Sequence, residues 1–191
     1  VMETYRPVRV TRLDKGCYVY DLGQNFSGRP RIKVEGSAGA TVKIIPGELL
    51  DDKGYVSQRS SGGPMWFSYT LKGQGVEEWA PQFSYYGFRY LQVEGVRAGQ
   101  DEEEKHLPLL LEAAGEFTHA SAEVIGAFEC ANPLVNRIHG LIMAAIRSNL
   151  QSVLTDCPHR EKLGWLEVPH LLADGLMYNF DLPQFYAKIQ Q

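Results

Sequence analysis

The chain has 191 residues, of which 44% are hydrophobic and 22% charged, a balance typical of an ordinary globular protein. Its formal net charge of -4 and its pI near 5.8 argue against nucleic acid or an anionic membrane as the main partner. No apolar run approaches the roughly 20 residues that a membrane-spanning helix needs.

The first hundred residues carry the signals of β-strands. Five short runs are rich in β-branched and aromatic residues, at 17–22, 31–36, 41–47, 66–71 and 88–95. In the second run Ile32 and Val34 alternate with Lys33 and Glu35, which is the period-two pattern of a sheet with one face in water. Turns rich in Gly, Asp and Pro separate the runs, and no long helical pattern intervenes. The pattern predicts an antiparallel β-sandwich.

A group of aromatic residues in this region has two possible roles. Its members are Trp66, Phe67, Trp79, Tyr85, Tyr86, Phe88 and Tyr90. Aromatic rings can stack on sugar rings, so a carbohydrate-binding surface is one interpretation. The other, which we favour, is that the rings fill the space between two sheets.

A connection is expected around residues 97–115, near the end of the sandwich domain. The first part, RAGQDEEEK at 97–105, is polar and acidic, which predicts a solvated loop. LPLLLEAAGEFTHA at 107–120 fits either a short helix or, around Glu116 to Thr118, a final strand of the sandwich. We therefore place a β-sandwich domain at 1–126 and a second domain at 127–191.

The second region carries helical patterns. Asn132 can cap a helix, and Pro133 stands at the first helical position, where its missing N–H costs nothing. Apolar residues follow at helical spacing in a stripe wide enough to pack on more than one neighbour: Leu134, Val135, Ile138, Leu141, Ile142, Ala145 and Ile146. Residues 170–180 give a second helix, and 181–183 open a third that continues to the end of the chain.

These helices are too few to close an all-α domain, because their apolar faces need a larger core. The chain also begins at Val1 without a basic-then-apolar leader. We therefore expect the 191 residues to be a fragment of a longer protein, whose remainder packs on the helices.

The segment TDCPHREKLGW, at 155–165, lies between the first two helical patterns and is unusually rich in polar groups. Such side chains need a partner or water and do not build a core. Asp156, Cys157, His159 and Glu161 offer ligand atoms, but their spacing matches no zinc pattern. We expect neither a metal nor another cofactor.

Cysteine chemistry is also disfavoured. Cys157 and His159 are two residues apart in a loop, where side-chain heads seldom align, and no third orienting group is evident. Together with Cys17 and Cys130 the cysteines are odd in number and far apart, so no disulfide framework is predicted. The cysteines indicate no particular cellular compartment.

A pair of carboxylates fits the segment better. Glycoside hydrolysis needs one carboxylic acid that donates a proton to the leaving oxygen, and Glu161 is a candidate. The alternative is a helix N-terminus with Asp156 as its cap and the acids as surface charges.

The segment resembles the D-C-P-x-R-x-x-L-G-W signature of bacterial α-L-rhamnosidases, glycoside hydrolase family 78. FECANPLVNRI at 128–138 looks like the family's entry into its catalytic (α/α)6 barrel, and 20–54 and 83–95 look like the β-sandwich that precedes it. The likeness covers nearly the whole chain in the right order. It implies an antiparallel β-sandwich followed by the first helices of an (α/α)6 barrel.

The resemblance also implies roles for individual residues. Glu161 matches the general acid of the family. Asp156 and Arg160 match residues that bind rhamnose hydroxyls, and Trp165 matches an aromatic that lines the sugar pocket. The family inverts stereochemistry, so a second carboxylate must activate water about 6.5–9.5 Å from the acid. The resemblance implies that this base lies downstream of the present chain.

One departure concerns the residues after Trp165. Typical members continue L-G-W-T-G-D, whose Asp also contacts the sugar, whereas this chain has Leu166, Glu167 and Val168. Glu167 is one residue away from the expected Asp and is a further candidate for substrate binding.

We expect a fragment of an inverting glycoside hydrolase that cleaves terminal α-L-rhamnosides, with a rhamnose-containing glycan as its partner and no activity alone. The alternatives are a non-catalytic carbohydrate-binding protein on the same scaffold and a hydrolase for a different glycan.

Overall fold

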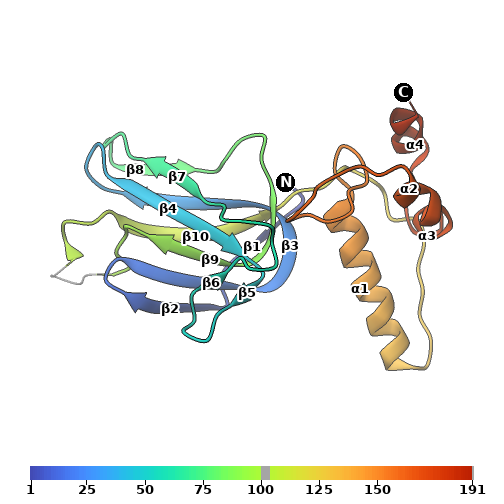
Figure 1. The fold of residues 1–191 in the computed structure, drawn as a ribbon, viewed down its shortest axis with the longest axis horizontal. Helices are drawn as coiled ribbons and strands as arrows, with labels where there is room; N and C mark the ends of the chain where they lie inside the picture. The colour runs from blue at the N-terminus through green and yellow to red at the C-terminus, as the bar shows by residue number, and fades with distance from the viewer. Residues whose placement is uncertain (100–103, 191) are drawn as a thin grey trace. The chain divides into compact units, whose positions relative to one another are not determined.

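The computed structural model describes residues 1–99 and 104–190, which form two compact units, Val1–Thr118 and His119–Gln191 (Figure 1). The first is built of strands and the second of helices. The boundary between the units lies after Thr118, earlier in the chain than the boundary expected between residues 126 and 127. The residues that follow Thr118 pair with the helical unit. The N–H of Ala120 donates to the carbonyl of Leu150 at 2.6 Å, and that of Ile125 donates to the carbonyl of Asn179 at 2.9 Å.

The first unit is organised around one long strand. Its strands are β1 (Glu3–Tyr5), β2 (Arg9–Asp14), β3 (Cys17–Glu35), β4 (Thr41–Gly47), β5 (Leu49–Leu50), β6 (Val56–Ser57), β7 (Phe67–Thr70), β8 (Val76–Trp79), β9 (Tyr86–Glu94) and β10 (Leu109–Phe117). The two runs expected at 17–22 and 31–36 both belong to β3. The other three expected runs correspond to β4, β7 and β9.

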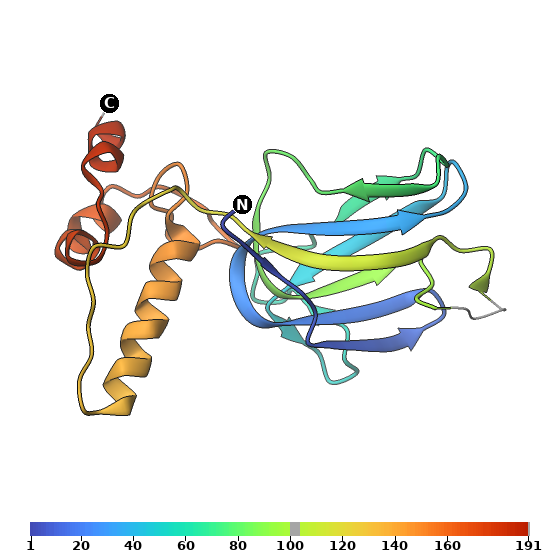
Figure 2. The ribbon, with the colours of Figure 1, turned by 180° about the vertical axis from the view of Figure 1, so that it is seen from behind.

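Strand β3 joins two layers of sheet. Its first half pairs with β2 and β9, and β9 continues to β4 and β7. Its second half pairs with β10 and β8, and β10 continues to β1. The register with β9 shifts between Asp21 and Phe26, where the blue strand curls in Figure 2. Each of these pairings is antiparallel, which confirms the predicted antiparallel β-sandwich.

The hydrophobic core of this unit lies between the two layers. Ile32 and Val34 are fully buried, as the alternation in the second run predicted. Tyr86 and Phe88 are also buried, while Phe67 and Trp79 pack against the same cluster. The packing role is therefore confirmed for these aromatic residues, whereas the Trp66 ring is exposed and lies 5.4 Å from Lys43 Nζ.

The expected connection at 97–115 is wrong in two respects, although residues 100–103 lie outside the described part of the chain. Leu109–Phe117 forms β10, so the strand interpretation of 107–120 holds over a longer stretch than expected. Glu104, expected in a solvated loop, is fully buried. Its carboxylate accepts hydrogen bonds from Gly16 N at 2.8 Å, Arg12 Nη2 at 2.8 Å and Tyr18 Oη at 3.0 Å. These donors offset the cost of burying a charge.

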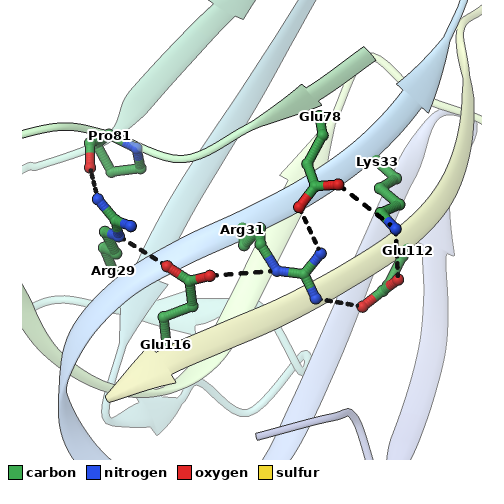
Figure 3. A network of polar contacts seen from close by, with 7 residues as sticks. All are labelled: Arg29, Arg31, Lys33, Glu78, Pro81, Glu112 and Glu116. Carbon is green, nitrogen blue, oxygen red and sulfur yellow. Dashed lines mark hydrogen bonds and ion pairs between the residues drawn. The ribbon is translucent and has the colours of Figure 1, made fainter. Parts of the chain in front are cut away.

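The outer face of the second half of β3 carries a network of ion pairs (Figure 3). Arg31 lies at its centre, 2.9 Å from Glu78 on β8 and 2.6 Å from Glu112 on β10. Glu116 binds both Arg31, at 3.3 Å, and Arg29, at 2.8 Å. Cross-strand charge pairs of this kind stabilise a sheet by about 0.2–1 kcal/mol each. The network therefore accounts for the polar face that the alternation predicted.

A second ion pair makes the stability of this unit depend on pH. Arg89 donates two hydrogen bonds of 2.8 Å to Asp21, which holds the pKa of that carboxyl below its usual value. Because the folded pKa is depressed, the pair stabilises the fold above the unfolded pKa of about 3.9 and ceases to do so as pH falls through the folded pKa.

We expect Asp21→Asn to lower the urea midpoint at pH 7, and we expect this difference from the wild type to shrink toward pH 2. Urea unfolding followed by tryptophan fluorescence at several pH values measures it. A difference between the two urea midpoints that stays constant down to pH 2 would contradict the stabilising role of the Asp21–Arg89 ion pair.

The second unit contains α1 (Pro133–Asn149), α2 (Glu167–Leu171), α3 (Ala173–Asn179) and α4 (Pro183–Ile189). The side chain of Asn132 accepts a hydrogen bond of 3.0 Å from Leu134 N, so the predicted helix start is confirmed. The helix expected at 170–180 is instead divided into α2 and α3 at Leu172, whose backbone (φ -98°, ψ 1°) departs from helical geometry.

The helical unit has only a small core. Its buried members are Ile146, Leu150, Leu154, Leu176, Phe180 and Leu182. Much of the apolar stripe on α1 is exposed, including Leu134, Ile138 and Leu141. Packing of further polypeptide on this stripe stays a prediction. No helix in the described residues is long and apolar enough to cross a membrane.

Candidate functional site

The polar segment at 155–165 begins where α1 ends. The N–H of Thr155 donates to the carbonyl of Asn149 at 2.9 Å, and the Thr155 hydroxyl donates to Oδ1 of the same residue at 3.1 Å. Asn149 Nδ2 in turn donates to the carbonyl of Ala145 within the helix, at 3.0 Å. Thr155 is buried, so these bonds attach the start of the segment firmly to the last turns of α1.

Asp156 closes the segment into a loop. Its N–H donates to the carbonyl of Leu163 at 3.0 Å, and the N–H of Leu163 donates back to Asp156 Oδ1 at 2.9 Å. Lys162, just before the closure, has a φ of 57°, a left-handed conformation that non-glycine residues seldom adopt. Such strain persists only where surrounding bonds determine the backbone, and here the two bonds between Asp156 and Leu163 do so.

Cys157 forms hydrogen bonds with both Asp156 and the backbone of Glu161 inside this loop. Its thiol donates to Asp156 Oδ2 at 3.3 Å and accepts a hydrogen bond of 3.2 Å from the backbone N–H of Glu161. Burial by itself raises the pKa of Asp156. The hydrogen bonds from Leu163 and Cys157 lower it by more, so the pKa lies below its ordinary value. Asp156 is therefore a fixed, ionised hydrogen-bond acceptor at neutral pH.

The other predicted site residues are more exposed than Asp156. Arg160, Glu161 and Glu167 are all exposed, with Glu167 at the start of α2. Trp165 is 45% exposed and borders a different cavity from Asp156, together with Val153 and Pro169. The structure thus brings Asp156 and Glu161 into one loop and places Trp165 beside a separate hollow.

Gly164 allows the chain to pass close to a neighbouring turn. A Cβ atom at this position would lie 2.7 Å from Val153 Cγ2, which is too close for any larger residue without displacement. The close approach of Val153 therefore explains why a glycine stands between Leu163 and Trp165.

Asp156 borders a cavity of about 260 Å³ that is lined by residues of α1, the loop, α2 and α3. Its lining combines the polar side chains of Asn149, Thr155 and Asp156 with apolar ones that include Val168 and Leu172. Asn149 and Thr155 were not among the site residues predicted from the sequence. The available signal was a pair of polar residues at the end of one helix and the start of the polar segment.

No group of three or more His, Cys, Asp or Glu side chains within the described ranges is placed to hold a metal ion. The chemistry that these side chains offer is hydrogen bonding by ionised groups and proton donation by a carboxylic acid.

Two family models match the chain. The concanavalin-like domain of bacterial alpha-L-rhamnosidase matches residues 11–110, and the bacterial alpha-L-rhamnosidase 6 hairpin glycosidase domain matches residues 123–191. The order of the two matches confirms the predicted fold class, a β-sandwich followed by helices of an (α/α)6 barrel.

Curated proteins with similar sequences carry the same family name. An alpha-L-rhamnosidase of Formosa agariphila is 32% identical over 196 residues, which cover 100% of this chain and 20% of the relative. An alpha-L-rhamnosidase of Streptomyces avermitilis is 35% identical over 184 residues, which cover 94% of this chain and 17% of the relative.

Solved structures are similar as well. The alpha-L-rhamnosidase from Dictyoglumus thermophilum superposes with a TM-score of 0.87 at 35% identity, over 98% of this chain and 21% of that protein. The Streptomyces avermitilis alpha-L-rhamnosidase complexed with L-rhamnose superposes with a TM-score of 0.83 at 34% identity. The match covers 98% of this chain and 18% of that protein. The chain therefore spans about one fifth of the length of the relatives that it matches.

Proposed function

This chain belongs to the bacterial α-L-rhamnosidase family, and we propose that it forms part of an inverting glycoside hydrolase that cleaves terminal α-L-rhamnosides. The closed loop at 155–165, which holds the carboxylate of Asp156 and the backbone of Glu161 on one short segment, is the observation that carries this proposal.

Glu161 is the proposed general acid. Its backbone is held by the Cys157 thiol while the residue remains exposed, so the carboxyl group is accessible to a bound glycoside. A carboxylic acid in that position donates its proton to the glycosidic oxygen as the bond to the sugar breaks. General acid catalysis of this kind contributes about 10²–10⁴-fold to the rate.

The neighbouring residues are proposed to bind the sugar. Asp156, ionised and fixed by its bonds to Leu163, accepts hydrogen bonds from sugar hydroxyls. Arg160 donates to them, Glu167 is a further acceptor, and the exposed ring of Trp165 offers an apolar face to the sugar.

Inversion requires a second carboxylate, about 6.5–9.5 Å from the acid, that activates water on the opposite side of the sugar ring. We propose that this base comes from another part of the polypeptide, and that the 191 residues alone do not catalyse hydrolysis. The chain's length, about one fifth of that of its relatives, supports this expectation.

The test compares the complete polypeptide with the 191-residue chain on 4-nitrophenyl α-L-rhamnopyranoside. We expect the complete polypeptide to release L-rhamnose, first as the β-anomer in a proton NMR time course, and we expect no release by the 191-residue chain. Turnover by that chain would contradict the proposal that it lacks the base. A complete polypeptide that binds L-rhamnose but releases none would instead be a carbohydrate-binding protein.

A further inference from the structure

We propose that Cys157 is a positioning residue, whose thiol fixes the carboxylate of Asp156 and the backbone of Glu161 relative to one another. This inference rests on the proposed function and deepens it. In this role the thiol forms no covalent bond with the substrate. It acts through the residue that binds the sugar and the residue that donates the proton.

The sulfur atom of Cys157 takes part in two hydrogen bonds of opposite sense. As a donor it contacts Asp156 Oδ2 at 3.3 Å, and as an acceptor it receives the backbone N–H of Glu161 at 3.2 Å. A thiol offers a weak donor and a weak acceptor, and both are used on these two residues. Because one atom makes both contacts, a displacement of the sulfur displaces both partners.

The bond to Asp156 completes the fixation of its carboxylate. Leu163 N donates to Oδ1 at 2.9 Å, and the Cys157 thiol donates to Oδ2. With one bond on each oxygen, the carboxylate cannot rotate without losing a bond. A carboxylate has about four acceptor sites, so each oxygen can still accept a hydroxyl of the sugar. Removal of the thiol therefore leaves Asp156 able to bind the sugar, but in a less defined orientation.

The bond to Glu161 acts next to the strained part of the loop. Glu161 directly precedes Lys162, whose φ of 57° lies in the left-handed region. Glu161 is also exposed, so burial does not fix its place. The bond from its N–H to the thiol therefore fixes the point from which the acidic side chain extends. Misplacement of a reacting group by about 1 Å can cost about 10²-fold in rate.

A space-filling role is the alternative for Cys157. The residue is only partly buried, and within the described residues it does not belong to the buried core of the helical unit. Serine and alanine fill space about equally well, so a space-filling role predicts similar variants. A positioning role separates them, because the serine hydroxyl is again both a donor and an acceptor.

The experiment compares Cys157→Ala and Cys157→Ser in the complete polypeptide, on methyl and 2,4-dinitrophenyl α-L-rhamnopyranosides. For Cys157→Ala we expect kcat on the methyl glycoside, whose leaving group needs the proton, to fall about 10- to 100-fold. On the dinitrophenyl glycoside kcat should change far less. KM should rise for both substrates, because Asp156 loses its fixed orientation. Cys157→Ser should restore most of both losses.

Cys130→Ala is the matched control, because it removes another partly buried thiol from the same unit, one that contacts the carbonyl of Asn132 at 3.5 Å. It should leave kcat and KM unchanged. A double variant tests the connection to the acid. Adding Cys157→Ala to Glu161→Gln should lower kcat on the methyl glycoside no further, because residues that act as a unit are not additive.

Three results would overturn the inference. Equal kinetics for Cys157→Ser and Cys157→Ala would show that the side chain only fills space. An equal loss of kcat on the two substrates with unchanged KM would show that it only supports the fold. A further loss of kcat in the double variant would show that it acts independently of Glu161. If Cys157→Ala does not fold, Cys157→Val, which fills the site without forming either bond, replaces it in each comparison.

The inference and the proposed function fail differently. If the wild type cleaves neither substrate, or if Glu161→Gln matches it on the methyl glycoside, the proposed function or its acid is wrong. Calorimetric binding of free L-rhamnose then decides the inference through Asp156. Binding that Cys157→Ala weakens and Cys157→Ser restores supports it. Unchanged binding by Cys157→Ala, or no binding by the wild type, overturns it.

Discussion

Replacing Glu161 with glutamine is expected to lower kcat for α-L-rhamnoside hydrolysis by the complete polypeptide by about 10²–10⁴-fold. The amide has nearly the same size but cannot donate a proton as a carboxylic acid does. The hydrogen bond that holds residue 161 in place runs from its backbone N–H to the Cys157 thiol, so the substitution leaves it intact. The residue is exposed, so the free energy of unfolding should change by less than about 0.5 kcal/mol.

The size of the loss should depend on the leaving group. A phenolate with a strongly electron-withdrawing ring departs with little protonation, whereas an alkoxide needs the proton. Glu161→Gln should therefore reduce kcat for an alkyl rhamnoside far more than for a 2,4-dinitrophenyl rhamnoside.

Glu129→Gln is the control, since it makes the same change at an exposed residue in the same unit. It should leave both rates at the wild-type value. Equal rates for Glu161→Gln and the wild type on the alkyl substrate would show that Glu161 is not the acid.

Replacing Phe26 with alanine is expected to lower the free energy of unfolding of the β-sandwich by about 3–5 kcal/mol. Phe26 is 1% exposed and stands where the register of β3 shifts, at the bend between the two layers. Its ring centroid lies 4.6 Å from that of Tyr5, 4.7 Å from that of Phe88 and 5.9 Å from that of Phe117. Alanine would leave a cavity among rings from three other strands, which the surrounding backbone cannot close.

The approach of β10 makes relaxation at this site harder. A Cβ atom at Gly115 would lie 2.3 Å from Phe26 Cζ, so the ring already touches the backbone of the next strand. Urea unfolding measures the loss as a lower midpoint.

Phe83→Ala is the control, because Phe83 is 105% exposed and its removal should change stability by less than about 0.5 kcal/mol. If Phe26→Ala prevents folding, Phe26→Leu should show a smaller loss of the same sign. Equal midpoints for the Phe26 and Phe83 variants would contradict the assignment of Phe26 to the core.

Short-range patterns in the sequence were reliable guides to the fold. The alternation of Ile32 and Val34 with charged residues identified the buried face of β3, because side chains on a strand point to opposite sides in turn. Asn132 and Pro133 marked the start of α1, because capping depends only on adjacent residues.

Features that depend on distant partners were not predictable in this way. Glu104 stands in an acidic run, and its burial depends on donors from Arg12, Gly16 and Tyr18, which lie 86 to 92 positions earlier in the chain. The strand at 109–117 was ambiguous because its pairing with β3 is not visible in its own residues. The continuity of β3 through its bend was missed for the same reason, since it depends on pairing with β9 on both sides of the register shift.

By itself, the sequence determined the order of the two units, the β-sandwich, the capped first helix and the segment whose motif places this chain in its family, because each depends on local pattern or residue identity. Only the tertiary structure decided which side chains share a cavity. It brings Asn149, Thr155 and Val168 to one cavity with Asp156, whereas Trp165 borders another. Those relations depend on how α1, the loop and α2 pack, which is a property of contacts between elements and is absent from any one stretch of sequence.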